Sequence, residues 1–189
     1  MTSFYDAEEL RQLGFAKVGS NVLISRKASI YGAENMSIGS NVRIDDFCIL
    51  SGKINIGNYI HIAAYSALYG GVYGIFIDDF SNISSRVSIY ALSDDYSGES
   101  MTNPMIPNKY KKIIEQRVEI QRHVIVGSGS VILPGCVLSI GSSFGALTLI
   151  NRDSEEWSVN AGIPFKKIKE RSRHILELEK ELLRENKDE

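Results

Sequence analysis

The sequence predicts a parallel β-solenoid of triangular cross-section, and two observations carry that prediction. Apolar residues, nearly all of them branched aliphatics, recur at every sixth position, and a small or β-branched residue usually follows four places later. A sustained period of six fits neither the 3.6-residue period of an α-helix nor the alternation of a single strand. It fits a prism in which each hexad forms one short strand and one corner. The two long runs are Ile38, Ile44, Leu50, Ile56, Ile62 and Leu68, then Ile114, Ile120, Val126, Ile132, Leu138, Phe144 and Ile150.

The coils of such a prism should stack on one another through parallel strands. Three hexads make one coil, with the aliphatic side chain inside and the small residue near a corner. Each coil then hydrogen-bonds to the coil before it and covers its open end. Shorter runs of the same period extend the prediction over residues 18–164. They are Val18, Ile24 and Ile30, then Ile77, Ile83 and Ile89.

Composition excludes several other classes of protein. The 189 residues are 43% hydrophobic and 23% charged, which is enough apolar content for one domain with a real core. No stretch approaches the roughly 20 apolar residues of a membrane-spanning helix, and the charged N-terminal segment does not resemble a signal peptide. A formal net charge of -2 does not indicate nucleic-acid binding. Two cysteines, Cys48 and Cys136, suit a reducing compartment, so we expect a cytoplasmic protein without membrane insertion.

The N-terminal segment, residues 1–17, is expected to cap the first coil. Asp6 followed by Glu9 has the spacing of a capping box, which predicts a short helix over residues 6–13. Within the solenoid, the glycine-rich stretch 70–74 lies between Leu68 and Ile77 and predicts a three-residue insertion at a corner. Glycines permit the positive φ that such a corner needs.

The repeat is interrupted between Ile89 and Ile114. This stretch holds a polar, acidic segment and two prolines, Pro104 and Pro107. We expect an excursion loop over residues 93–113 that leaves the prism at one corner and returns near Ile114. Structureless loops longer than about 12 to 15 residues are usually functional or disordered, and we expect a functional one here.

The C-terminal segment, residues 165–189, is predicted to be a helix. It follows Pro164, and it places Ile168, Ile175, Leu178 and Leu182 on one face. An amphipathic helix of this kind normally packs its apolar face back on the domain.

Three segments near the end of the chain carry a family resemblance. They are Ile132-Leu-Pro-Gly135, the stretch LSIGSSFGALTLI at 138–150, and Ala161-Gly-Ile-Pro-Phe-Lys166. In order and spacing they resemble motifs of the hexapeptide-repeat acyltransferases, which have a left-handed parallel β-helix. The resemblance covers roughly residues 18–164. It implies acetyl-CoA as the acyl donor and a homotrimer in which the donor lies between adjacent prisms.

The resemblance also implies where the donor binds. Backbone groups of Gly145 and Ala146 match positions that grip the pantetheine arm, and Lys166, Lys167 and Arg171 match basic residues that meet the phosphates. Phosphate oxygens accept charge-assisted hydrogen bonds from such side chains. A solvated charged face is the alternative reading of the basic cluster. Ser139, Leu147, Ile163 and Phe165 depart from the commonest residues of these motifs.

His61 is the candidate general base. Imidazole titrates closest to working pH, and the segment around His61 resembles the one around a groove histidine of bacterial amino-sugar acetyltransferases. A corner histidine bonded to a carbonyl is the alternative. We expect His123 to be structural and His174 to be solvated.

The excursion loop holds candidate substrate-binding residues, namely Asp94, Asp95 and Tyr96. The sequence SDDYSGE resembles a subgroup of the family that acylates dTDP-linked 4-amino-4,6-dideoxy sugars for surface polysaccharides such as O-antigen and lipopolysaccharide. A carboxylate is a weak base unless burial raises its pKa, so these aspartates are expected to hold the sugar or orient a histidine. A solvated turn is the alternative.

The function expected from this resemblance is transfer of an acetyl group from acetyl-CoA to the amine of a nucleotide-linked amino-dideoxy sugar. One alternative is O-acetylation of a sugar or polysaccharide. Another is a non-catalytic β-helix that acts as a scaffold or binding module. A carbonic anhydrase on this prism would need three histidines converging on zinc, and the spacing of the three histidines does not indicate such a site, so no metal is expected.

Overall fold

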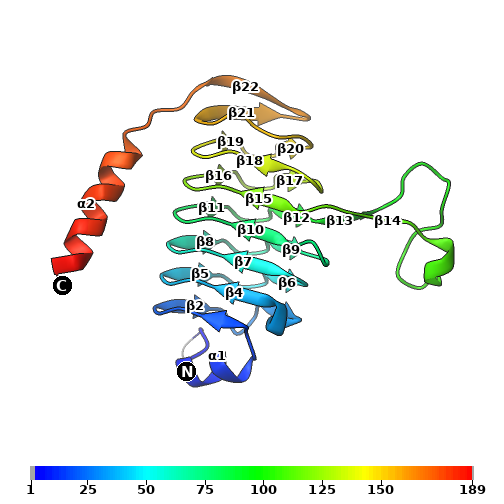
Figure 1. The fold of residues 1–189 in the computed structure, drawn as a ribbon, viewed down its shortest axis with the longest axis horizontal. Helices are drawn as coiled ribbons and strands as arrows, with labels where there is room; N and C mark the ends of the chain where they lie inside the picture. Colours follow the sequence, from blue (N-terminus) through cyan, green and yellow to red (C-terminus); the bar gives the residue numbers. More distant parts are fainter. Residues whose placement is uncertain (1–2, 189) are drawn as a thin grey trace.

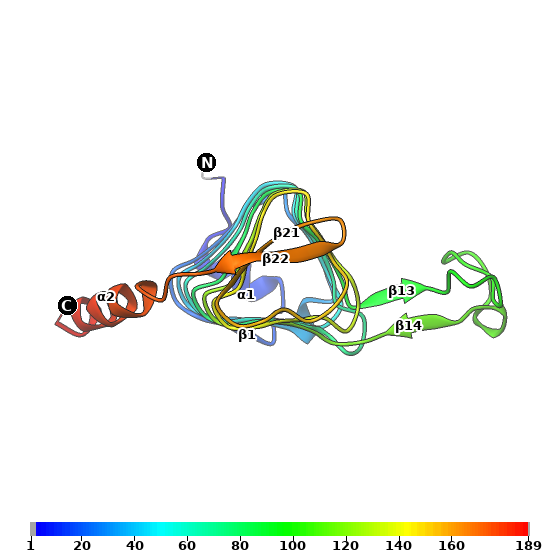
Figure 2. The same ribbon diagram turned by 90° about the horizontal axis from the view of Figure 1, so that it is seen from above.

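In the computed structural model, which describes residues 3–188, the chain winds as a left-handed parallel β-helix with three sides (Figure 1 and Figure 2). The predicted fold class is therefore confirmed. The three sides are sheets of six, eight and six strands, all parallel except for the last strand of the eight-stranded sheet. They are here called sheets I, II and III in the order in which each coil visits them. Each coil turns at the I–II, II–III and III–I corners, and Figure 2 shows these corners superposed along the axis.

The strands are short and belong to the sheets in regular alternation. Sheet I contains β1 (Lys17–Val18), β4 (Met36–Ile38), β7 (Ile54–Ile56), β10 (Ile75–Ile77), β15 (Val118–Ile120) and β18 (Val137–Leu138). Sheet II contains β2 (Val22–Ile24), β5 (Val42–Ile44), β8 (Ile60–Ile62), β11 (Asn82–Ile83), β16 (Ile125–Val126), β19 (Ser143–Phe144), β21 (Ser158–Gly162) and β22 (Phe165–Glu170). Sheet III contains β3 (Ser29–Tyr31), β6 (Ile49–Ser51), β9 (Ala67–Tyr69), β12 (Ser88–Tyr90), β17 (Val131–Ile132) and β20 (Leu149–Ile150).

The sixfold aliphatics form three columns inside the prism, as predicted. In sheet II, Ile44 pairs with Ile62, which pairs with Ile83, and all three side chains are fully buried. Away from the insertions, the residue four places after the aliphatic is usually also buried, which explains why it is small or β-branched. These second positions include Val42, Cys48, Ser66, Val124, Ser130, Cys136, Ser142 and Thr148.

All insertions into the repeat lie at the III–I corner. The 3-10 turn η1 (Ala33–Asn35) is the first, and the predicted glycine-rich corner is the second, where the N–H of Gly74 donates to the carbonyl of Gly70 at 2.8 Å. The third is the excursion, which forms an arm rather than a loose loop. Its strands β13 (Leu92–Asp94) and β14 (Ile113–Glu115) pair antiparallel, and η2 (Asn108–Tyr110) lies near its tip.

The arm overturns one detail of the predicted repeat. Ile114 was expected to line the interior, but it lies in β14 and its side chain is 43% exposed. The return strand of the arm happens to keep the sixfold phase, because Ile114 precedes the buried Ile120 by one hexad. The interior resumes with Val118. Figure 2 shows the arm pointing away from the prism.

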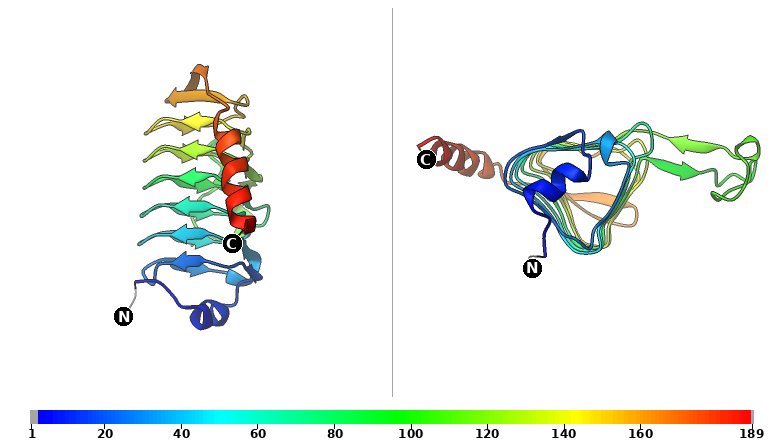
Figure 3. Two further views of the ribbon diagram at one scale, coloured as in Figure 1. Left: turned by 90° about the vertical axis from the view of Figure 1, so that its left-hand side faces the viewer. Right: turned by 90° about the horizontal axis from the view of Figure 1, so that it is seen from below.

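The two ends of the prism are capped differently. Helix α1 (Ala7–Gln12) has the predicted capping box between Asp6 and Glu9, and it lies beneath the first coil with Leu10 in the core (Figure 3). At the other end, residues 165–170 are not helical as expected. They form β22, which folds back antiparallel on β21 and covers the last coil of sheet II.

Helix α2 (Ile175–Asp188) therefore begins at Ile175 and not at residue 165. It runs beside the prism back toward the N-terminal end (Figure 3). Glu179 fixes it to the I–II corner by accepting hydrogen bonds from Arg122 and by contacting Nε2 of His123 at 2.7 Å. Although burial acts to raise it, these hydrogen bonds hold the pKa of Glu179 below its ordinary value, so the carboxylate is ionised at neutral pH.

The I–II corner beneath α2 is built from stacked rings. The ring centroids of Tyr59 and Phe80 lie 4.8 Å apart, and those of Phe80 and His123 lie 5.4 Å apart. All three residues have positive φ. The tight corner requires this backbone conformation, and the stacking of the rings stabilises it. His123 thus has the structural role expected of it.

No helix among the described residues is long and apolar enough to cross a membrane.

The interior columns lead to a direct test by truncation. Ile62→Ala removes a fully buried side chain from the middle of sheet II and should lower the free energy of unfolding by roughly 2–5 kcal/mol. Leu23→Ala on the outer face of the same sheet, where the side chain is 38% exposed, should cost far less. Denaturant unfolding of both variants measures the difference. Equal losses would contradict the assignment of inner and outer positions.

Candidate active site

A polar cluster lies on the outer face of sheet II. His61 is the outward residue of β8, and its Nε2 lies 2.8 Å from Oδ2 of Asp45, which follows β5 one coil below. The other carboxylate oxygen of Asp45 accepts a hydrogen bond from Nε of Arg43 at 2.7 Å. Burial acts to raise the pKa of Asp45, but the hydrogen bonds from Arg43 and His61 lower it below its ordinary value.

This arrangement sets the role of each imidazole nitrogen. Because Asp45 is ionised, it takes a hydrogen bond from the protonated Nε2 of His61, which leaves Nδ1 as the nitrogen with a lone pair. The His61 side chain is 41% exposed, so a substrate can reach it. Asp45 and Arg43 thus orient His61, and the alternative in which this histidine bonds a backbone carbonyl is not what the structure shows.

A column of residues runs up the prism from Asp45 along the edge of sheet II. One residue per coil occupies the same place, each donating its backbone N–H to the coil above: Asp45, Ala63, Ser84, Gly127 and Gly145. With strands about 4.8 Å apart, the column from Asp45 to Gly145 is about 20 Å long. An extended ligand can lie along this column, and His61 lies near its lower end.

Small residues keep the upper part of this column free of side chains. A Cβ on Gly127 would lie 2.5 Å from the backbone nitrogen of Ala146, so glycine is required where these coils approach. Gly145 and Ala146 are both exposed at the II–III corner above it. The residues predicted to meet a pantetheine arm therefore lie in line with His61, three coils higher.

The three predicted phosphate ligands differ in how free they are. Lys166 in β22 is exposed and makes no ion pair within residues 3–188. Lys167 contacts Glu155 at 2.6 Å and Glu170 at 2.5 Å, and these hydrogen bonds raise its pKa. Arg171 donates Nη1 to the carbonyls of His123 and Gly141, and burial lowers its pKa. Arg171 is thus part of the packing of the I–II corner, whereas Lys166 is open to a ligand.

The predicted substrate-binding residues of the arm also separate into distinct roles. Asp95 is buried, and it accepts hydrogen bonds from the N–H of Ser97 at 2.9 Å and from the hydroxyls of Ser97 and Ser100. These bonds lower its pKa and use its oxygens to shape the turn. The carboxylate of Asp94 has no such partner among the described side chains, and Tyr96 is 93% exposed. Asp94 and Tyr96 are therefore the members of the trio that are free to bind something else.

The arm and His61 do not meet within one chain. The arm leaves the prism between β12 of sheet III and β15 of sheet I, at the corner opposite sheet II, and it points outward. His61 faces outward from sheet II. The structure thus brings His61 into contact with Asp45, places Ser84 and Gly145 higher on the same face, and leaves Asp94 and Tyr96 on another side.

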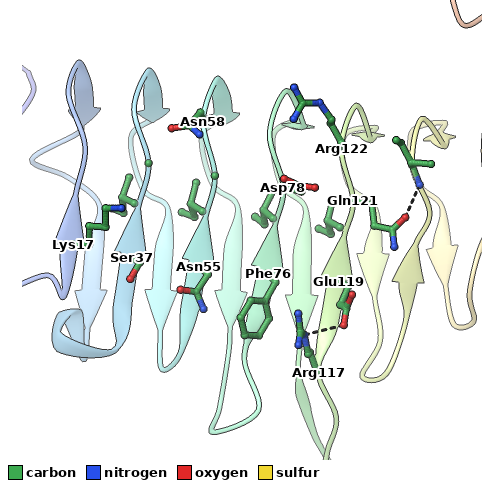
Figure 4. Close-up of a pocket in the computed structure, with 17 residues that line it drawn as sticks. Lys17, Ser37, Asn55, Asn58, Phe76, Asp78, Arg117, Glu119, Gln121 and Arg122 are labelled. Carbon is green, nitrogen blue, oxygen red and sulfur yellow. Dashed lines mark hydrogen bonds and ion pairs between the residues drawn. The ribbon is translucent and has the colours of Figure 1, made fainter. Parts of the chain in front are cut away.

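A separate groove lies on the outer face of sheet I. It has a volume of about 680 Å³ and is lined by outward residues of successive strands, including Ser37, Asn55 and Phe76 (Figure 4). The guanidinium of Arg117 lies 3.8 Å from the centroid of the Phe76 ring and pairs with Glu119. None of the residues predicted for catalysis or donor binding lines this groove.

The three histidines do not form a metal site. His61 contacts Asp45, His123 is buried against Glu179, and His174 is bonded to Glu177 just before α2. Within residues 3–188 no group of three or more histidine, cysteine, aspartate or glutamate side chains could hold a metal ion.

Asp45 and Ser84 were not anticipated from the sequence. Asp45 directly follows the interior Ile44, and Ser84 directly follows the interior Ile83, so both stand where each strand turns outward. Many residues of the repeat have that position. The register places both in the column beside His61, where they are the two members with polar side chains.

Two Escherichia coli proteins named as acyl or acetyl transferases are similar to this chain in sequence. No protein-family model matches the chain. The dTDP-4-amino-4,6-dideoxy-D-glucose acyltransferase of Escherichia coli is 50% identical over 180 residues, which cover 94% of this chain and 93% of that protein. A putative lipopolysaccharide biosynthesis O-acetyl transferase of E. coli K12, WbbJ, is 27% identical over 155 residues, covering 77% and 74%.

A solved structure is similar over nearly the whole chain. The N-acyltransferase AntD from Bacillus cereus, in complex with dTDP and 3-hydroxybutyryl-CoA, superposes with a TM-score of 0.96 at 52% identity, covering 99% of this chain and 100% of that one. The S84A mutant of AntD was solved with dTDP-4-amino-4,6-dideoxyglucose and coenzyme A, and the D94A mutant with dTDP and coenzyme A.

The contrast between the two arm aspartates can be tested by hydrogen exchange. Asp95→Ala removes the acceptor of the Ser97 N–H and should speed amide exchange over residues 95–100 by roughly ten- to a hundredfold, since a bond to a charged group contributes roughly 1.5–3 kcal/mol. Asp94→Ala, the matched control, should leave exchange there unchanged. Equal effects of the two substitutions would contradict the assigned roles.

Proposed function

The chain belongs to the family of dTDP-4-amino-4,6-dideoxy-D-glucose acyltransferases, and on that premise we propose that it transfers an acyl group from coenzyme A to the amine of a dTDP-linked 4-amino-4,6-dideoxy sugar. The observation that carries the proposal is the match to AntD over the whole β-helix and arm, because AntD binds both a dTDP-sugar and coenzyme A. Acetyl-CoA is the donor we expect first, and the 3-hydroxybutyryl-CoA bound to AntD marks the second donor to try.

His61 is proposed to act as the general base. The sugar amine attacks the thioester carbonyl, and the C–N bond forms as its proton passes to Nδ1 of His61. The C–S bond then breaks, and the thiolate of coenzyme A takes the proton back from the imidazolium. Asp45 stabilises the imidazolium through its contact with Nε2 at 2.8 Å. A positioned base of this kind contributes typically 10²–10⁴-fold to a rate.

The column above His61 is proposed to hold the acyl donor. The backbone N–H groups of Ser85 and Ala146 make no hydrogen bond to the described part of the chain, so each can donate to the donor. The N–H of Ser85 would stabilise the thioester oxyanion, since preorganised N–H donors are the usual device for this charge. That of Ala146 would bind the pantetheine arm, and Lys166 at the top of the column would meet the phosphates.

Ser84 and Asp94 are proposed to contact the sugar substrate. The chain has serine and aspartate at the two positions whose numbers appear in the AntD mutants. Ser84 lies in the column beside His61, and the carboxylate of Asp94 is free to bind the positively charged form of the amine or a hydroxyl. Tyr96, fully exposed beside it, would cover the sugar.

The active unit is proposed to be a homotrimer in which two chains complete each site. One chain supplies His61, Ser84 and the donor column, and the arm of its neighbour supplies Asp94 and Tyr96. The opposite placement of arm and sheet II within one chain supports this division. We place the enzyme in the cytoplasm, where its two buried free cysteines would stay reduced, and in the synthesis of surface polysaccharides such as O-antigen.

The reaction can be tested by thiol release with a panel of acceptors. We expect turnover of dTDP-4-amino-4,6-dideoxyglucose with acetyl-CoA, with an amide in the product by mass spectrometry. His61→Asn should lower kcat by roughly a hundredfold or more without changing the fold. An ester product formed only from hydroxyl acceptors would instead establish an O-acyltransferase, the activity in the name of the WbbJ relative. Near wild-type turnover by His61→Asn would remove it from the base role.

The shared site can be tested by mixing two inactive variants. In a ring of chains, a site that takes His61 from one chain and Asp94 from the next is intact wherever an Asp94→Asn chain meets a His61→Asn chain in the correct order. Random assembly of co-expressed His61→Asn and Asp94→Asn chains should therefore restore about a quarter of wild-type activity. Mixtures of separately assembled proteins serve as the control. No recovery on co-expression would place both residues in one chain's site.

A further inference from the structure

An extended segment near the N-terminus, residues 3–5, lies along the free edge of β2 at the lower end of sheet II (Figure 1). Phe4 forms an antiparallel bridge with Ser25, the residue that directly follows β2. Two backbone hydrogen bonds, of 3.0 and 2.9 Å, flank this bridge and join the segment to residues 24 and 26. The backbone on both sides of Phe4 is therefore fixed relative to sheet II.

The ring of Phe4 contacts the side chain that orients the proposed general base. The guanidinium carbon of Arg43 lies 5.4 Å from the centroid of the Phe4 ring. Nε of Arg43 donates to Oδ1 of Asp45 at 2.7 Å, and Oδ2 of Asp45 accepts a hydrogen bond from Nε2 of His61 at 2.8 Å. Four side chains thus form an unbroken series of contacts from the N-terminal segment to His61.

Arg43 needs a partner besides Asp45 because it lies on an open face of the prism. Its side chain is 56% exposed, and a long exposed side chain loses conformational entropy when it stays on one carboxylate. Exposed ion pairs therefore hold their geometry weakly. A guanidinium over the face of an aromatic ring is attracted by the quadrupole of that ring. Phe4 thus favours the conformation in which Arg43 reaches Asp45.

The charge of Arg43 also bears on the protonation of His61. The two residues are register partners on β5 and β8, and they bond opposite oxygens of the same carboxylate. Asp45 alone favours the imidazolium form, whereas a guanidinium beside it opposes a second positive charge. Asn82, the register partner of His61 on the other side, is uncharged. Arg43 therefore favours the neutral imidazole, which is the form that can accept a proton.

We propose that the N-terminal segment is a positioning element of the active site. Phe4 holds Arg43 on Asp45, and these two charged groups together keep His61 neutral, with Nδ1 open to the substrate. The inference rests on the proposed role of His61. Neither Phe4 nor Arg43 contacts the proposed donor column, so their loss should change the pH dependence of the rate and leave KM nearly unchanged.

The proposal can be tested by following His61 directly with NMR. The histidines are labelled at Cε1, and the His61 signal is assigned by its loss in His61→Asn. Arg43→Gln should raise the pH midpoint of the His61 titration by roughly half a unit, a modest shift because water screens an exposed charge. Arg43→Lys keeps the charge and should lie closer to the wild type. Phe4→Leu should raise the midpoint by less than Arg43→Gln, because it frees the guanidinium without removing it.

The matched control is Tyr5→Leu, which removes the neighbouring ring of the same segment. The guanidinium carbon of Arg26 lies 5.3 Å from the centroid of the Tyr5 ring, but Arg26 pairs with Glu9 of α1. Tyr5 packs against the core, so Tyr5→Leu should lower the free energy of unfolding and leave the His61 midpoint unchanged. A shift caused by general loosening of the segment would appear in this variant as well.

An unchanged His61 midpoint in Arg43→Gln, or equal shifts in Phe4→Leu and Tyr5→Leu, would overturn the proposal. If it holds, the acid limb of the kcat/KM profile should move to higher pH together with the NMR midpoint, since that limb reports the base of the free enzyme. A midpoint that moves while the kcat/KM profile stays in place would remove His61 from the base role. The positioning of His61 by Phe4 and Arg43 would still stand in that case, so the two failures are distinguishable.

Discussion

Burial of one apolar side chain per hexad is the constraint on which the rest of this molecule depends. Because each coil covers the last in strict register, an insertion within a strand would move whole columns out of the core. Insertions are therefore confined to corners, and in this chain η1, the glycine-rich turn and the arm all lie at the III–I corner. The other two corners remain free to carry stacked rings, one under α2 and one open to solvent.

The same register creates the candidate site. Outward residues that are far apart in the sequence become neighbours one strand spacing apart, so that Arg43, Asp45 and His61 form a connected group. Above them the column consists of Ser84, Gly127 and Gly145. Serine and glycine are small, so the backbone groups there stay accessible. The proposed general base is thus held on a rigid face, while the residues proposed to meet the sugar lie on a projecting arm.

The fold was predictable because its interior positions repeat, so each hexad tests the same hypothesis again. Local exceptions to the repeat were not predictable from the sequence. Residues 165–170 contain good helix formers, and only pairing with β21 makes them a strand. Ile114 keeps the sixfold phase by coincidence. His61 could be proposed as a base from its type and context, but its contact with Asp45 and the position of Ser84 needed the register. The difference between Asp94 and Asp95 needed the hydrogen bonds of the turn.

The capped ends of the prism have a consequence for how the protein behaves in the crowded cell. A parallel coil stack has no natural stopping point, since its last turn offers unpaired N–H and C=O groups to any similar turn, as in amyloid fibrils. Here α1 inserts Leu10 under one end, and β22 lays an antiparallel, charged strand over part of the other. These two short segments keep a molecule built like a fibre from growing end to end.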